Sequence, residues 1–212
     1  MTKLVKLIRW SGLANIAAGL LLTAYWFLFA LLMPYSKLTN SLAPLIRDGD
    51  YIWINILGVI GAITGLLGLI GIFLRQVEEI SGVGIAGFLL GFSGTVMFTG
   101  QLMWETFVWP VLFLFDPSVF EFDGLLYSNP LFLGILVVLG TAFGIGLLLF
   151  GIATARAGVL PRVPAWEIAI GAPLFSLGAL AGPLQVVVRT LGLIFYVIGL
   201  VWIGTVMWRE ER

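Results

Sequence analysis

The sequence predicts an all-α fold, a polytopic membrane helix bundle in which residues 1–212 form a single domain with six transmembrane helices. Of the residues, 60% are hydrophobic and 10% are charged, whereas soluble domains have about 25% charged residues. The mean hydropathy is +1.11. The apolar residues also form long runs, and a membrane-spanning helix needs about 20 mainly apolar residues.

The first three expected helices follow from these runs. The helix over 10–33 comes after the basic segment "MTKLVKLIR" and is longer than the apolar core of a cleaved signal peptide. The second helix, 51–74, stops at "RQVEE". The third, 83–108, stops before Pro110, where an outer loop over 110–130 begins. This loop is too polar and has too many prolines to cross a membrane.

The last three helices share the remaining apolar residues. The fourth is expected over 131–154. The segment "AGPLQ" then divides the final run, because Gly182 suits a helix end and Pro183 suits a first turn. This division predicts a short helix over 164–181 and a long one over 183–208.

The basic residues predict the orientation. Membrane proteins carry an excess of lysine and arginine in their cytoplasmic loops. Six spans place eight basic residues on the side of the termini and three on the other, so we expect both termini in the cytoplasm. The first group is Lys3, Lys6, Arg9, Arg75, Arg156, Arg162, Arg209 and Arg212, and the second is Lys37, Arg47 and Arg189.

Glycines recur along the helices 51–74 and 83–108 at a 3-4-3 spacing, which keeps them on one face. Small residues at such spacing let helices approach closely in lipid. Because a short loop joins these two helices, we expect their glycine faces to meet. The glycines are Gly58, Gly61, Gly65 and Gly68 in one helix and Gly84, Gly87, Gly91 and Gly94 in the other.

An internal repeat is a further hypothesis. The segment "ILGVIGAITG" (56–65) matches "ILVVLGTAFG" (135–144) at five of ten positions. Three tandem helical hairpins would produce this pattern, and internal repeats are common in transporters. Helices rich in Gly, Leu and Ile also match by chance, so both explanations stay open.

The segments "RAGVLPRVPAW" (156–166) and "GLVWIGTVMWREER" (199–212) resemble a large group of uncharacterised small six-helix bacterial membrane proteins. The resemblance covers mainly the fourth to sixth helices. It implies a location in the bacterial plasma (inner) membrane, and it implies no activity.

Ionisable residues inside spans are rare and indicate function or pairing. Glu105 has Gln101 four residues before it, and Arg189 has Gln185 four residues before it, so each pair shares a helix face. Both pairs lie at a similar depth near the outer side, as does Asn55. We expect Glu105 and Arg189 to pair. The cluster is either an internal salt bridge or a ligand-binding site open to the outside.

Tryptophans near the outer side are typical of the aromatic belt at a membrane interface. Trp53, Trp104 and Trp109 are also a candidate aromatic wall for a cation beside Glu105. In the 110–130 loop, four phenylalanines could lie in the interface, cover the polar cluster as a lid, or contact another protein. They are Phe113, Phe115, Phe120 and Phe122.

The residue types limit the function. The chain has no histidine and no cysteine, and no expected span contains an aspartate, so we expect no enzyme, no metal site and no cofactor. A net charge of zero argues against nucleic acid. We expect a non-catalytic membrane protein, either an accessory subunit or a binder of lipid or another apolar ligand. Its partners would be membrane lipid and, through the 110–130 loop, another membrane protein. The alternative is a small transporter of a cationic or apolar solute that uses Glu105.

Overall fold

A computed structural model describes residues 2–33 and 40–209. Lys37 and Arg212, two of the basic residues used to predict the orientation, lie outside these ranges. Within them the chain is a bundle of helices, and six helices are long and apolar enough to cross a membrane. This confirms the predicted all-α membrane helix bundle. The six are α1 (Lys3–Leu32), α3 (Tyr51–Arg75), α4 (Gly82–Phe107), α7 (Pro130–Ala157), α8 (Arg162–Leu177) and α9 (Gln185–Arg209), and short 3-10 turns extend the last two spans to Arg162–Leu180 and Gly182–Arg209.

Local sequence explains where several helices begin and end. The hydroxyl of Ser81 accepts a hydrogen bond from the backbone N–H of Gly84 and caps the start of α4. The Asn129 side chain caps α7, whose first residue is Pro130. At the other end of α7, Gly158 has a φ of +70°, the left-handed conformation in which glycine commonly ends a helix.

The break between the last two long helices is longer than the sequence predicts. Two 3-10 turns, η3 (Gly178–Leu180) and η4 (Gly182–Leu184), separate α8 from α9. The glycine at the expected break, Gly182, has a φ of +54°. The helix α9 therefore starts at Gln185, and Arg189 lies in its second turn.

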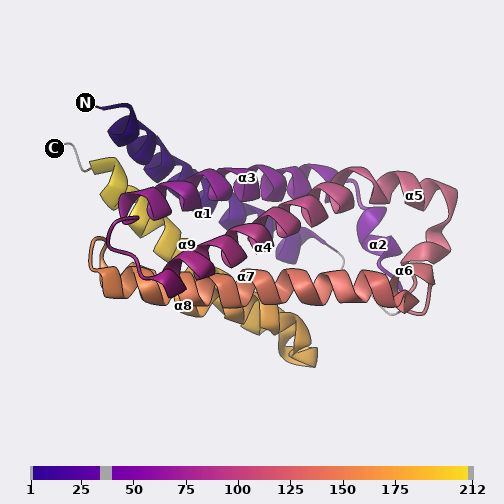
Figure 1. Ribbon diagram of the computed structural model, residues 1–212. Helices are drawn as coiled ribbons and strands as arrows, with labels where there is room; N and C mark the ends of the chain where they lie inside the picture. Colours follow the sequence, from indigo (N-terminus) through magenta and orange to yellow (C-terminus); the bar gives the residue numbers. More distant parts are fainter. Residues whose placement is uncertain (1, 34–39, 210–212) are drawn as a thin grey trace.

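The six long helices form a closed ring in sequence order. Each packs against the next one in the chain, and α9 packs against α1 to close the ring. The pairs α1–α3, α4–α7 and α8–α9 are three tandem hairpins. Figure 1 shows both termini at one end of the bundle, here called the terminal end. The other, the loop end, carries α2 (Ala43–Ile46), α5 (Trp109–Phe115), η2 (Pro117–Phe120) and α6 (Leu125–Ser128).

The prediction that the glycine faces of α3 and α4 meet is wrong. The glycines of α3 lie against α1, where Gly61 faces Leu22 and Gly68 faces Asn15. The glycines of α4 lie against α7, and Gly91 and Gly146 are in reciprocal close approach. Each helix of the ring has two neighbours. In α3 and α4 the glycine face lies toward the neighbour with the larger contact, which is the other helix of the same hairpin.

Large side chains fill the interface between α3 and α4 instead. The rings of Phe73 and Phe88 are stacked there with centroids 4.2 Å apart. The matched glycines of the proposed repeat also differ in their contacts: Gly65 of α3 faces α1, whereas Gly144 of α7 faces Pro173 and Ser176 of α8. The hairpins are present, but these glycines do not have equivalent partners.

A small cap at the loop end joins two segments that are far apart in the chain. The backbone N–H of Leu42 donates to the carbonyl of Phe120 at 3.0 Å, and that of Phe122 donates to the carbonyl of Asn40 at 2.8 Å. The Phe120 side chain is fully buried, with its ring 5.4 Å from that of Trp109. The 110–130 segment is therefore folded against the bundle, although Phe115 on α5 is 83% exposed.

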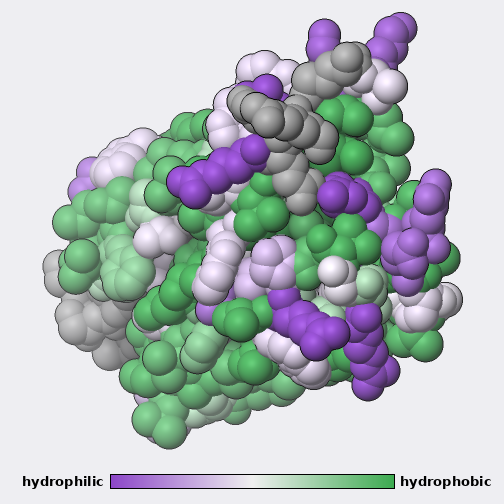
Figure 2. All heavy atoms as spheres, turned by 90° about the vertical axis from the view of Figure 1, so that its left-hand side faces the viewer, coloured by the Kyte–Doolittle hydropathy of each residue, from purple (hydrophilic) through white to green (hydrophobic). Residues whose placement is uncertain are grey.

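The surface matches a protein surrounded by lipid along its length. Figure 2 looks onto the terminal end, where hydrophilic residues gather, whereas the sides beyond them are largely hydrophobic. Charged residues in the first or last turns of the helices there include Lys6, Arg75, Arg156 and Arg209. The fold and the apolar helices indicate an integral membrane protein.

Candidate functional site

The loop end of the bundle contains a cavity of about 390 Å³. We call it the loop-end cavity. Its lining combines four polar side chains with a group of aromatic ones. Four of the predicted cluster residues are those four polar side chains: Gln101, Glu105, Gln185 and Arg189. The structure thus brings together two helix faces that are about 80 residues apart in the sequence.

On the α4 side of the cavity, Glu105 is held by neighbours from its own helix and from α3. Gln101 lies one turn earlier, and its Nε2 donates to Glu105 Oε1 at 2.7 Å. The hydroxyl of Tyr51 donates to the backbone carbonyl of Glu105 at 3.3 Å. The carboxyl group therefore has one amide donor and keeps further acceptor capacity toward the cavity.

On the α9 side, the guanidinium of Arg189 lies over two aromatic rings. Its carbon Cζ is 4.7 Å from the centroid of Phe175 and 5.0 Å from that of Trp26. Trp26 is fixed in turn, because its Nε1 donates to Thr190 Oγ1 at 2.8 Å. A Cβ on Gly178 would lie 2.6 Å from Arg189 Cγ, so a glycine leaves room for the arginine to pass.

The expected ion pair between Glu105 and Arg189 is absent from the described part of the chain. Both side chains line the same cavity, yet the carboxyl group bonds to Gln101 and the guanidinium stacks on aromatic rings. Each group has a neutral partner on its own side of the cavity. The Nε of Arg189 is buried and has no hydrogen-bond partner.

Asn55 does not belong to the cavity lining. Its side chain is fully buried within the bundle, and its Nδ2 donates to the carbonyl of Tyr51, one turn earlier, at 2.7 Å. Asn55 lies at the predicted depth, but its side chain is buried among the helices and does not line the cavity.

The predicted aromatic wall is wrong for two of its three residues. Trp109 is buried and lines the cavity, whereas Trp53 and Trp104 are 42% and 47% exposed and lie outside the lining. Trp104 is adjacent to Glu105, and consecutive helical residues point about 100° apart. Trp53 turns outward, where its Nε1 donates to Asp50 Oδ1 at 2.7 Å.

Other aromatic residues, which the sequence did not single out, form the wall instead. All except Phe122 come from α1, α3, α4, α8 and the short helices α5 and α6, so aromatic rings line the cavity on several sides. Tyr51 belongs to the buried face of α3, a signal that the spacing of Ile54, Asn55 and Gly58 could have given. The aromatic lining consists of Tyr25, Trp26, Phe29, Tyr51, Phe98, Trp109, Phe122, Tyr127 and Phe175.

Tyr127 is the contribution of the short helix α6, which lies outside the long helices. Burial raises the pKa of its phenol well above the usual range, and the nearby charge of Glu105 acts in the same direction. The phenol therefore remains protonated and available as a hydrogen-bond donor beside Glu105 at neutral pH.

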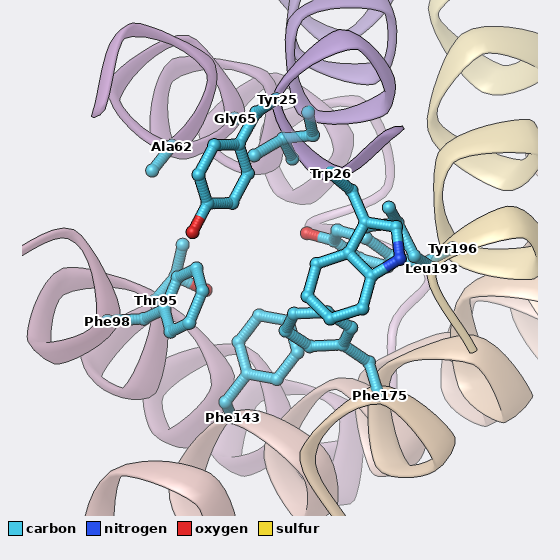
Figure 3. Close-up of a pocket in the computed structure, with 11 residues that line it drawn as sticks. Tyr25, Trp26, Ala62, Gly65, Thr95, Phe98, Phe143, Phe175, Leu193 and Tyr196 are labelled. Carbon is cyan, nitrogen blue, oxygen red and sulfur yellow. The ribbon is translucent and has the colours of Figure 1, made fainter. Parts of the chain in front are cut away.

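A second, much smaller cavity of about 30 Å³ lies in the middle of the ring. Figure 3 shows side chains from all six long helices around it, most of them aromatic or aliphatic. Four aromatic residues line both cavities: Tyr25, Trp26, Phe98 and Phe175. An aromatic layer therefore separates the two.

Beyond the small cavity, toward the terminal end, large apolar side chains fill the bundle. Leu69, Leu147, Phe150, Leu200 and Ile203 are each less than 2% exposed. In the part of the chain that the structure describes, the loop-end cavity thus has no continuation to the terminal end.

Among the described residues, no group of three or more acidic residues lies together as metal ligands would. Comparison of the chain with protein-family models, with curated proteins and with solved structures finds no match. The resemblance to six-helix bacterial membrane proteins stays a prediction, and the site is interpreted from its own geometry.

Proposed function

We propose that this protein is a non-catalytic integral membrane protein that binds a lipid or another apolar ligand in the loop-end cavity. The proposal also places it in a bacterial plasma membrane, with both termini in the cytoplasm and the cavity on the outer side. The observation that carries it is the cavity itself. Its volume of about 390 Å³ lies within the roughly 300–1,000 Å³ of small-molecule sites, which are mostly apolar with a few placed polar groups.

The lining supports a ligand that has both apolar and polar parts. Tyr25, Phe98 and Phe175 provide apolar surface at the boundary with the small cavity. Glu105 and Arg189 provide the polar groups. Binding without catalysis is supported by the residue types, since the chain has neither histidine nor cysteine.

The test is to block the mouth of the cavity. Gln185 lines it and is exposed, so Gln185→Trp should fill the opening. The matched control is Val186→Trp, because Val186 is exposed but lies outside the lining. Native mass spectrometry of protein purified in mild detergent should show bound lipid or another apolar ligand on the wild type and on Val186→Trp. Gln185→Trp should lose it. Equal retention by all three proteins would overturn the proposal.

A transporter that uses Glu105 is the second candidate, and the small central cavity favours it. That cavity lies directly behind the aromatic layer and is lined by all six long helices, as a transport path through the ring would be. Uptake of a cationic or apolar solute into proteoliposomes, lost in Glu105→Gln, would favour this function over binding alone.

The role as an accessory subunit remains part of the proposal. Leu114 and Phe115 of α5 are 82% and 83% exposed at the loop end. They support the use of the 110–130 segment as a contact for another membrane protein.

A further inference from the structure

Two opposite charges face the loop-end cavity from different helices without forming an ion pair. Glu105 belongs to α4 and is held by Gln101, whereas Arg189 belongs to α9 and is held by Trp26 and Phe175. A charge without a paired counter-charge is costly inside a membrane protein. A ligand that itself carries one positive and one negative group would satisfy both at once.

We propose that the ligand is a zwitterionic phospholipid headgroup, with its phosphate at Arg189 and its ammonium at Glu105. This inference rests on the proposed function and names the class of lipid. Arginine binds phosphate oxygens through parallel N–H donors in one plane. The plane of Arg189 is held against Phe175 and Trp26, and its Nε has no partner in the protein. Gln185, one turn earlier on the same face, adds an amide donor for the phosphate.

The surroundings of Glu105 suit an ammonium group. The hydroxyl of Tyr51 donates to the backbone carbonyl of Glu105. Trp109, four residues after Glu105, and Tyr127 line the same cavity. Aromatic faces attract ammonium and quaternary ammonium groups. An ammonium beside Glu105 would supply a counter-charge, which Gln101, a neutral donor, does not.

The geometry favours a membrane lipid over a free zwitterion because the cavity opens at the exposed Gln185, whose neighbours Leu184, Val186 and Val187 form apolar surface. Residues of α7 are absent from the lining that the structure describes. The turn between α8 and α9 diverges from α7 in Figure 1. The first part of α7 exposes Leu131, Ile135 and Val138, and the start of α9 exposes Val187. Acyl chains can leave through this side over apolar surface, whereas the small cavity of about 30 Å³ has no room for them.

The test is a competition in mild detergent between phosphatidylethanolamine and phosphatidylglycerol with identical acyl chains, read by native mass spectrometry. The wild type should retain the ethanolamine lipid about tenfold better, the effect of one charge-assisted hydrogen bond. Glu105→Gln should lose this preference and still retain phospholipid. Arg189→Gln should lose retention of both lipids, and Arg189→Lys should retain part of it. The control variants are Glu121→Gln and Arg47→Gln, whose side chains are exposed outside the lining.

The outcomes separate this inference from the proposed function. Retention of both lipids without preference, or a preference that survives Glu105→Gln, overturns the zwitterionic site and leaves lipid binding intact. Retention of neither lipid by the wild type overturns the phospholipid class. If the cavity then also carries no other apolar ligand, the proposed function fails with it. Free glycerophosphoethanolamine is the second competitor. If it displaces the bound ethanolamine lipid at an equal concentration, the site takes a soluble zwitterion and the lipid proposal is overturned. If it does not displace the lipid, the acyl chains are needed for binding, as proposed.

Discussion

Arg189 lies against the rings of Trp26 and Phe175, although a carboxyl group from α4 faces the same cavity. Burying an ion pair costs desolvation of both groups, and the attraction repays this only when the geometry is good. A guanidinium over an aromatic face gains about 2 kcal/mol when desolvated and leaves its N–H donors usable. The stacking thus holds the charge in place without neutralising it, which suits a binding residue.

Tyr127 allows a prediction of pH dependence at the scale of one residue. Its folded pKa is raised, mainly by burial, above the value of about 10 that an unfolded tyrosine has. The folded state therefore holds the phenolic proton more tightly than the unfolded state. The tighter binding of this proton stabilises the folded protein below about pH 10, and that stabilisation is lost as the pH rises further.

We expect Tyr127→Phe to reduce the loss of thermal stability of the detergent-solubilised protein between about pH 9 and pH 11. Near pH 7 the thermal stability of the wild type and that of the variant should differ by an amount that does not change with pH. An identical alkaline loss in both would show that the phenol is not buried beside Glu105.

How closely two helices pack depends on whether a glycine of one lies against the backbone of the other. In the α4–α7 interface it does, because a Cβ on Gly87 would lie 2.6 Å from the backbone nitrogen of Phe150. A backbone atom cannot move aside as the end of a flexible side chain can. By contrast, a Cβ on Gly65 would be 3.7 Å from the Cβ of Ala18, an ordinary contact, although Gly65 belongs to the same kind of seam.

At the scale of the helix, Gly87→Ala should therefore destabilise the protein by about 1–3 kcal/mol, the usual cost of overpacking. The matched control is Gly100→Ala on the same helix, where a Cβ would meet nothing within 4 Å. There, alanine should be neutral or stabilise by up to about 1 kcal/mol through helix propensity. Thermal aggregation of both variants in one detergent measures the difference, and equal midpoints would contradict the close contact.

The ring of helices explains why the molecule has a cavity at one end. At the terminal end the helices converge on small residues, such as Gly12 of α1 beside Gly204 of α9. At the loop end α8 stops early, and a cap made of the 40–42 and 109–128 segments closes part of the opening. The whole molecule is therefore asymmetric along its axis, and its orientation in the membrane determines which compartment reaches the site.

The predicted orientation can be tested with single cysteines, because the native chain has none. Asp123 is exposed at the loop end and Arg162 is exposed at the terminal end. In intact cells, Asp123→Cys should react with a membrane-impermeant maleimide, whereas Arg162→Cys should react after permeabilisation alone. The opposite pattern would place the cavity on the cytoplasmic side.

The sequence by itself determined the six long helices and the apolar environment around them, but not the short helices at the loop end or the two 3-10 turns between α8 and α9. Long apolar runs with capping residues such as Ser81 and Asn129 specify helices locally, and local hydrogen bonds are independent of the neighbouring helices. The spacing of Gln101 with Glu105 and of Gln185 with Arg189 determined two polar faces in the same way, because residues four apart on a helix always share a side.

The tertiary structure alone decided how those faces are used. Each helix in the ring has two neighbours, and the sequence does not say which of them the glycine face of α3 meets. The same holds for Arg189, whose cavity offers the carboxyl group of Glu105 as well as the rings of Trp26 and Phe175. Such choices depend on side-chain volumes and desolvation summed over residues far apart in the chain, and these become definite when the helices pack.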